Sequence, residues 1–174
     1  MGAKGLNIFV LDWNPFYAAR MLCDKHLPKM CVETAQMLAS AILRHNPKAS
    51  MPLTKAGTPY RGGYHPHPCT IWAGDSRLNF EWLVSHGRAM CEEYTRRFGK
   101  VHACEAPINH LAAVGLTIAW PAIDMTPPAQ AMPDEYRHDD AVVAYRAYYH
   151  SKTFAKWEKG APAPAWWKGL EVTA

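Results

Sequence analysis

The sequence has no long hydrophobic run and no recognisable targeting segment. None of its apolar runs reaches the length that a membrane-spanning helix needs, and the N-terminus lacks the basic region and apolar core of a signal peptide. It also has no internal repeat and no low-complexity tract. With 49% apolar and 20% charged residues, the composition is typical of a globular protein. We therefore expect a cytoplasmic protein that has no membrane partner.

Several common catalytic motifs are missing as well. The chain has neither a Walker loop nor a dinucleotide-binding fingerprint, which argues against the usual nucleotide-driven reactions. It has no GxSxG motif, which would favour a serine nucleophile. Its nine histidines include no HExxH motif. The sequence thus predicts no metal and no cofactor.

The five cysteines are odd in number and include no CxxC pair, so neither a disulfide framework nor a zinc ribbon is indicated. We expect reduced thiols that pack as small apolar side chains. Cysteine catalysis would need Cys23 or Cys31 close to His26, and a thiol buried in a helix is more often inert.

Apolar periodicity predicts a mainly α fold: a single helical domain over residues 1–174, with two long packed helices, long irregular loops and at most one short strand. The first long helix is expected at residues 14–45. Pro28 lies inside it and should kink it near residues 23–25, because proline removes one ladder hydrogen bond.

The second long helix is expected at residues 76–98, with Asp75 or Ser76 as its N-cap and Gly99 at its end. The other segments follow from their composition. They are a strand or extended buried segment at 6–11, a long loop at 46–68, a helix at 102–116, a proline-rich wrap at 119–136, a helix at 139–156 and an aromatic, basic tail at 157–174.

Each long helix carries a row of polar residues on an otherwise apolar surface. Placed on ideal helices, the first row falls within roughly a 100° arc and the second within roughly a 60° arc. They are Lys25, His26, Lys29, Glu33 and Gln36 on the first helix, and Asn79, His86, Glu93, Arg97 and Lys100 along the second. If the helices pack with these rows facing each other, they form one shared polar cleft. Alternatively, the first row is a solvated face with a Lys29–Glu33 ion pair.

A formal net charge of +4 favours an anionic partner. The C-terminal region mixes rings that can stack on bases with cations that can bind phosphate, as in Tyr145, Arg146, Trp166 and Trp167. The same rings could instead pack in the core. DNA or a nucleotide is the expected partner, and the oligomeric state is not determined by the sequence.

Two short motifs resemble the pyrimidine-dimer DNA glycosylases, the family that includes the phage endonuclease V. His26-Leu27-Pro28-Lys29 lies where that family has Glu-Leu-Pro-Arg, and Pro164-Ala165-Trp166-Trp167-Lys168 is similar to its C-terminal tail. Residues 23–36 also resemble uncharacterised phage-encoded proteins that share the pattern CDKHxxKMxxExAQ. The resemblance implies a helical scaffold, a DNA substrate and, for a phage-encoded chain, a location in the host cytoplasm.

The chain departs from this family at both groups that carry its chemistry. The resemblance places the family's essential carboxylate at His26, which is not an acid. The family also uses a free N-terminal amine that forms an imine with the sugar. Here residues 1–5 extend beyond the equivalent start, and removal of Met1 would expose Gly2.

Together these features predict a phage-type enzyme that processes DNA or a nucleotide, resembles a glycosylase or lyase, and acts on a base or its glycosidic bond between the two long helices. The candidate catalytic residues are Glu33, Glu93, His26 and Lys25, with one lysine as a potential imine-forming amine. The candidate substrate-binding residues are Lys29, Gln36, His67, Trp72, Asn79, His86, Arg97, Lys100, Tyr145, Arg146, Trp166 and Trp167. Two alternatives stay open: a nucleic-acid-binding protein without turnover, and a small-molecule enzyme that holds a nucleotide in a closed helical pocket.

Overall fold

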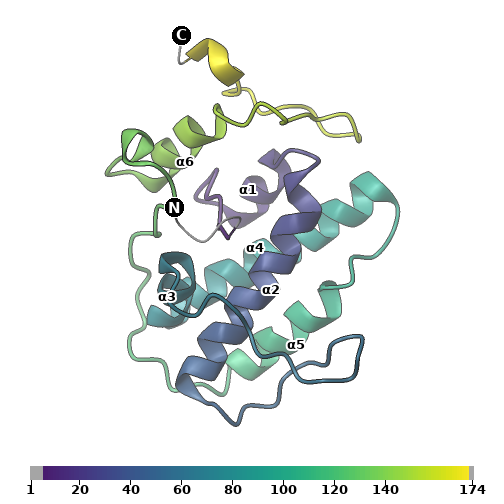
Figure 1. The fold of residues 1–174 in the computed structure, drawn as a ribbon, viewed down its shortest axis with the longest axis vertical. Helices are drawn as coiled ribbons and strands as arrows, with labels where there is room; N and C mark the ends of the chain where they lie inside the picture. The colour runs from purple at the N-terminus through teal and green to yellow at the C-terminus, as the bar shows by residue number, and fades with distance from the viewer. Residues whose placement is uncertain (1–5, 173–174) are drawn as a thin grey trace.

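The computed structural model describes residues 6–172 and confirms a mainly α fold (Figure 1). The elements are α1 (Pro15–Met21), α2 (His26–His45), α3 (Pro68–Asp75), α4 (Arg77–Phe98), α5 (Glu105–Gly115), η1 (Asp134–Tyr136), α6 (Ala141–Tyr149) and η2 (Gly169–Val172). Within the described residues, β pairing is limited to one isolated bridge, between Leu53 and Pro59. No helix of the described region combines the length and apolar character that crossing a bilayer would require.

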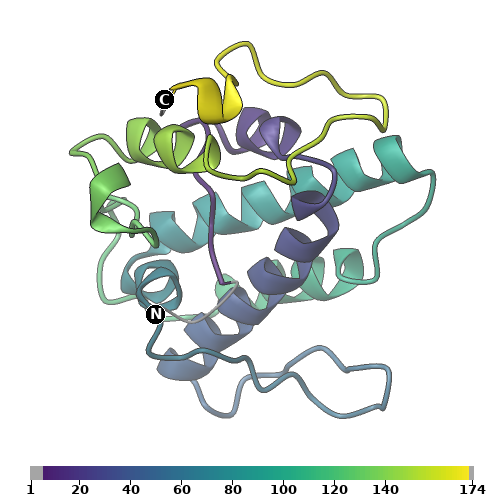
Figure 2. The same ribbon diagram turned by 45° about the horizontal axis from the view of Figure 1, so that its top comes forward.

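Helix α2 is the centre of the fold and packs against α3, α4 and α5 (Figures 1 and 2). Apolar side chains on most of its circumference are fully buried, including those of Leu27, Cys31, Leu38 and Ile42. A helix buried on nearly all sides must be enclosed by other elements. The start of α2 lies below α6 and the coil that follows it (Figure 1).

The predicted helix at residues 14–45 is two helices in the structure, so the expectation of one kinked helix is wrong. The chain leaves helical geometry at Leu22, whose ψ is 138°, and α2 begins four residues later. Pro28 is therefore in the first turn of α2, where a missing N–H costs no helical hydrogen bond. The break is fixed from α4, because the Arg97 guanidinium donates to the carbonyl oxygens of Leu22 (2.7 Å) and Arg20 (2.8 Å).

Helix α4 has the predicted length and ends. The hydroxyl of Ser76 accepts a hydrogen bond from the Asn79 N–H (3.1 Å), and Gly99 closes the helix with φ 71°. Serine at the N-cap and a left-handed glycine after the last turn are local signals that the sequence contains in full.

The last helix is shorter than predicted: it ends at Tyr149 and not at residue 156. The chain beyond it turns to cover the junction between α1 and α2. There the Asp24 N–H donates to the Lys156 carbonyl (2.9 Å), and the Trp157 indole N–H donates to the Met21 carbonyl (3.2 Å). These long-range contacts replace the helical hydrogen bonds that the local sequence favours.

Residues 6–11 form the extended buried segment that was one of the two alternatives, without strand pairing. Residues 46–67 form the predicted irregular loop, which is anchored on α2 by Ser40. The Ser40 hydroxyl donates to the Gly63 carbonyl (3.0 Å) and accepts from the Gly63 N–H (2.8 Å). These two hydrogen bonds hold the end of the loop, near Gly63, against α2.

Candidate active site

A cavity of about 950 Å³ lies beside the first turns of α2, and we call it the α2 pocket. One wall comes from residues 6–9, the start of α2 and the loop before α3, and the other comes from residues 130–154. Its volume is in the range of sites that hold a small ligand or a single nucleotide. Its main polar and aromatic lining residues are Phe9, His26, Lys29, Tyr64, His67, Gln130, Arg137, Tyr148, Lys152 and Phe154.

The α2 pocket is cationic and aromatic. Lys29, Arg137 and Lys152 line it, and none of the described lining residues is acidic. Arg137 has an ion pair with the exposed Asp134 (3.4 Å), whereas the Lys152 ammonium lies over the Tyr148 ring, 3.7 Å from its centroid. Cations beside aromatic faces are suited to a ligand with a negative group and a flat ring.

His26 is the first residue of α2 and is nearly buried at the wall of the pocket. Its ring stacks on Phe9, with centroids 4.6 Å apart, and its Nδ1 is hydrogen-bonded to the Tyr149 hydroxyl (2.9 Å). Burial and, to a smaller extent, the nearby ammonium groups, Lys152 first, together lower the pKa of His26 to about 3. His26 is therefore neutral at physiological pH and is a weak base.

Phe9 supports this ring from a backbone conformation that is unusual for phenylalanine. Its φ is 38°, in the left-handed region, which costs about 1 kcal/mol or more for a residue with a Cβ. The conformation is maintained by Asn7, whose side-chain oxygen accepts the N–H groups of Ile8 (2.8 Å) and Phe9 (3.1 Å). Strain of this kind is common where a side chain is held for binding.

Glu33 lies two turns after His26, on the same face of α2, because positions i and i+7 differ by about 20° around a helix. Its Oε1 accepts the Asn7 N–H (2.8 Å), and its Oε2 lies 3.8 Å from the Lys29 ammonium. Oε2 is buried and has no hydrogen-bond partner among the described residues. Burial raises the pKa of Glu33 to about 7, although Asn7 and Lys29 oppose the shift. The carboxyl can therefore both hold and release a proton near neutral pH.

Glu93 and Arg97 do not share this pocket. Glu93 borders a second cavity of about 580 Å³, together with Arg20, Arg96 and residues 160–165. Its carboxylate accepts hydrogen bonds from Arg96 (2.7 and 2.8 Å) and Arg97 (2.6 Å). Burial alone would raise the pKa of Glu93, but these two guanidinium groups hold it below its usual value.

The shared cleft between the two polar rows is consequently not found in the described region. The row on α2 starts at the α2 pocket, whereas Glu93 and Arg97 fix the junction between α1 and α2. The contact between Lys29 and Glu33 is present, but Glu33 is buried and not solvated. Lys25 is exposed beside the pocket, with its ammonium 4.7 Å from the Phe154 ring centroid. Gln36 is half-buried and Lys100 is exposed, and neither lines the α2 pocket.

Three of the predicted binding residues are buried structural groups. Asn79 donates to the Trp72 carbonyl and the Thr126 hydroxyl (both 2.8 Å) and accepts the Thr126 N–H (2.9 Å). The Trp72 indole N–H donates to the Thr126 carbonyl (3.0 Å). His86 is hydrogen-bonded to the Pro15 carbonyl (3.0 Å), and burial lowers its pKa to about 4. These contacts attach the extended segment near residue 126 and the start of α1 to α4.

The C-terminal candidates mainly pack, as the alternative interpretation held. The Tyr145 hydroxyl donates to the Ala129 carbonyl (2.6 Å), and Arg146 donates to the Leu11 carbonyl (2.8 Å) and lies over the Trp166 ring. Trp167 stacks on His150, with centroids 5.5 Å apart. None of these residues lines the α2 pocket.

Of the predicted site residues, His26, Lys29 and His67 line the α2 pocket, and Glu33 contacts its wall. The prediction missed Phe9, Arg137, Tyr148, Lys152 and Phe154, which also line it. The sequence contains a signal for one pair of these residues only. Tyr148 and Lys152 are four residues apart within the predicted helix at 139–156, a spacing that places two side chains next to each other. The N-terminal extension and its amine lie outside the described residues.

A buried carboxyl behind a cationic, aromatic pocket defines a site suited to binding a nucleotide-like anion and transferring a proton to or from it. Comparison with known families narrows this class. The family model of the pyrimidine dimer DNA glycosylases matches residues 7–105, more than half of the chain, and the chain belongs to this family. Membership indicates a DNA glycosylase-like function. No curated protein and no solved structure matches the chain.

Proposed function

We propose that this protein is a DNA glycosylase-like enzyme that binds an extruded nucleotide in the α2 pocket and cleaves the bond between its base and its sugar. The observation that carries the proposal is Glu33, a buried carboxyl with a pKa near 7, on the helix within the family-matched segment and next to a cationic pocket. Enzymes that act on a base in DNA take it out of the stack into such a pocket.

The residues that line the pocket include aromatic rings suited to a base and cations suited to a phosphate. Phe9, Tyr148 and Phe154 offer flat faces for a base, and Lys29 and Lys152 offer charge for a phosphate. His26, kept neutral, offers a hydrogen-bonding nitrogen and no fixed charge. The pocket volume is large enough for one nucleotide.

In the proposed reaction, Glu33 acts as both general acid and general base. As the bond between C1′ and the base nitrogen breaks, its electron pair leaves with the base, which takes the proton from Glu33. A water oxygen then bonds to C1′, and its proton returns to the Glu33 carboxylate. The Lys29 ammonium lies 3.8 Å from the unpaired oxygen, so the proposal includes a shift of this flexible side chain when substrate binds.

The test is cleavage of the glycosidic bond, read as alkali-labile strand breaks, in oligonucleotide duplexes with and without a pyrimidine dimer, for the wild type, Glu33→Gln and Glu92→Gln. Glu92 is exposed on α4 and is a matched control. We expect the wild type to cleave at least one of these duplexes, an at least 100-fold loss in Glu33→Gln and no loss in Glu92→Gln. Equal activity of the wild type and Glu33→Gln would contradict the role of this carboxyl.

Three further measurements separate the alternatives. Borohydride trapping reports whether an amine, such as a lysine of the pocket, forms an imine with the sugar. Salt-dependent DNA binding without base release would support a binding protein without turnover. Thermal stabilisation by a free mononucleotide but not by DNA would support a small-molecule enzyme.

A further inference from the structure

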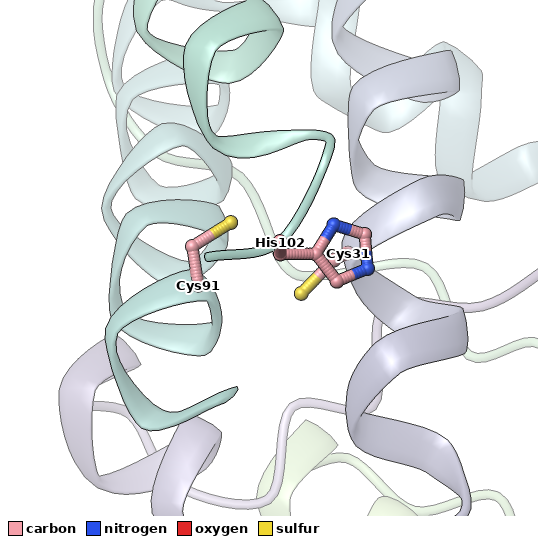
Figure 3. Close-up of side chains that lie close together, drawn as sticks. All are labelled: Cys31, Cys91 and His102. Atoms are coloured by element: carbon pink, nitrogen blue, oxygen red, sulfur yellow. The ribbon is translucent and has the colours of Figure 1, made fainter. Parts of the chain in front are cut away.

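A second cluster of reactive side chains lies between α2, α4 and the start of α5. Cys31 is on α2, Cys91 is on α4, and His102 is in the turn before α5 (Figure 3). Both sulfurs and one ring nitrogen lie within 4.8 Å of one another, and all three residues are buried. Figure 3 shows the three side chains close together on separate segments of the backbone. None of them lines the α2 pocket.

Both ring nitrogens of His102 are hydrogen-bonded. Nδ1 accepts the Cys104 N–H (2.9 Å), so the ring carries its proton on Nε2 and donates it to the Pro28 carbonyl (3.0 Å). Metal-binding histidines usually donate their second N–H to a carbonyl in this way, which fixes the tautomer and the ring orientation. Ligation through Nδ1 would replace the hydrogen bond from Cys104.

We infer that Cys31, Cys91 and His102 bind a thiophilic divalent cation such as Zn²⁺, with Cys104 as the fourth ligand. Three cysteines and one histidine form a closed, tetrahedral set that is common in structural zinc sites. Zinc bond lengths of about 2.3 Å to sulfur and about 2.0 Å to nitrogen place neighbouring ligand atoms about 3.5–3.8 Å apart. The cluster, whose ligand atoms lie within 4.8 Å of one another, therefore has to close by up to about 1 Å, through side-chain rotations and loss of the hydrogen bond from the Cys104 N–H to His102.

Cys104 is the proposed fourth ligand, and its thiol has to move inward, because it is not part of the group of ligand atoms within 4.8 Å of one another. It follows His102 by two residues and is buried, with its thiol close enough to Cys91 and Tyr60 to interact with both. Burial, and then the neighbouring Cys91, raises the pKa of Cys104 to about 11. For Cys31, the hydrogen bond with Cys91 and burial raise the pKa well above its usual value. Zinc binds cysteine as the thiolate, so metal binding should release protons and tighten as the pH rises.

Such a site would tie three segments together without entering the α2 pocket. Helix α2 carries Cys31 and also the pocket residues His26 and Lys29. Helices α4 and α5 both pack against α2. Structural zinc sites contribute directly to folding free energy. A bound cation would therefore hold α2 in place below the pocket, as a structural and not a catalytic ion.

The test is metal binding by the full chain, prepared metal-free under reducing conditions and titrated with Zn²⁺ and with Co²⁺. We expect one Zn²⁺ per chain by elemental analysis, a rise in Tm on adding Zn²⁺, and the absorption of tetrahedral thiolate-bound Co²⁺. Cys31→Ala and Cys91→Ala should each bind at least about 100-fold more weakly, since second-layer changes alone cost 10–100-fold.

Cys69→Ala is the matched control, because Cys69 is a fully buried thiol outside the cluster. It should bind Zn²⁺ as the wild type does. The inference would be overturned if the folded wild type, which needs no substitution, binds no Zn²⁺ under reducing conditions. Equal loss of binding in Cys69→Ala and Cys31→Ala would overturn it as well, as would a Cys31–Cys91 disulfide that persists in reductant. None of these outcomes depends on glycosylase activity.

Discussion

Replacing Glu33 with glutamine should remove a large pH dependence from the stability of this protein. The usual pKa of a glutamate, 4.5, is raised to about 7 in the folded chain, chiefly by burial. Between these values the folded state keeps the proton while the unfolded state releases it, so the free energy of unfolding falls as the pH rises. A difference of about 2.5 pKa units at about 1.4 kcal/mol per unit gives about 3 kcal/mol, lost between about pH 4.5 and pH 7.

The measurement is urea unfolding followed by tryptophan fluorescence, at pH 5 and pH 8, for the wild type and Glu33→Gln. The amide cannot ionise, so the variant should gain up to about 3 kcal/mol relative to the wild type between the two pH values. Contributions from buried histidines are common to both proteins and cancel in this difference. Glu92→Gln should show no such gain. If Glu33→Gln and the wild type lose stability in parallel from pH 5 to pH 8, Glu33 has an ordinary pKa and the acid–base role is lost with it.

Three further substitutions test the scaffold by urea unfolding. Arg97→Met should destabilise the fold by about 3–5 kcal/mol, because it leaves Glu93 buried beside fewer donors, and an unchanged midpoint would contradict this. Gly115→Ala should cost about 1–3 kcal/mol, because the new methyl group would collide with the Phe80 ring. Gly99→Ala, with φ 71° and open space around it, should cost only about 1 kcal/mol, and a larger loss would show an unrecognised contact.

Helix α4 shows what the sequence alone can predict. Both of its ends depend on groups within three residues of the boundary: the Ser76 hydroxyl at one end and the left-handed Gly99 at the other. Local chemistry of this kind is visible in the sequence. The mainly α class follows in the same way, from periodic apolar segments that are confirmed as α2, α4 and α5.

The junction between α1 and α2 shows the limit of such prediction. Apolar periodicity continues through it, so the sequence favours one helix, whereas the break is fixed by Arg97, more than seventy residues away. The rotation of α2 relative to α4 is equally non-local. A helical projection predicts that Glu33 and Glu93 each belong to a polar row, but not whether the rows face each other. The pocket residues contributed by coil, such as Phe9 and Phe154, have no periodic signal at all.

The two walls of the α2 pocket come from separate parts of the chain. Glu33, His26 and Lys29 lie within the family-matched residues 7–105, whereas residues 130–154 of the opposite wall lie beyond them. Substitutions in that opposite wall can therefore change the shape available to a ligand without replacing Glu33, the proposed proton-transfer group. Ligand preference and the proposed reaction chemistry can therefore change independently of each other. A new specificity could be engineered by replacing residues of the 130–154 wall alone.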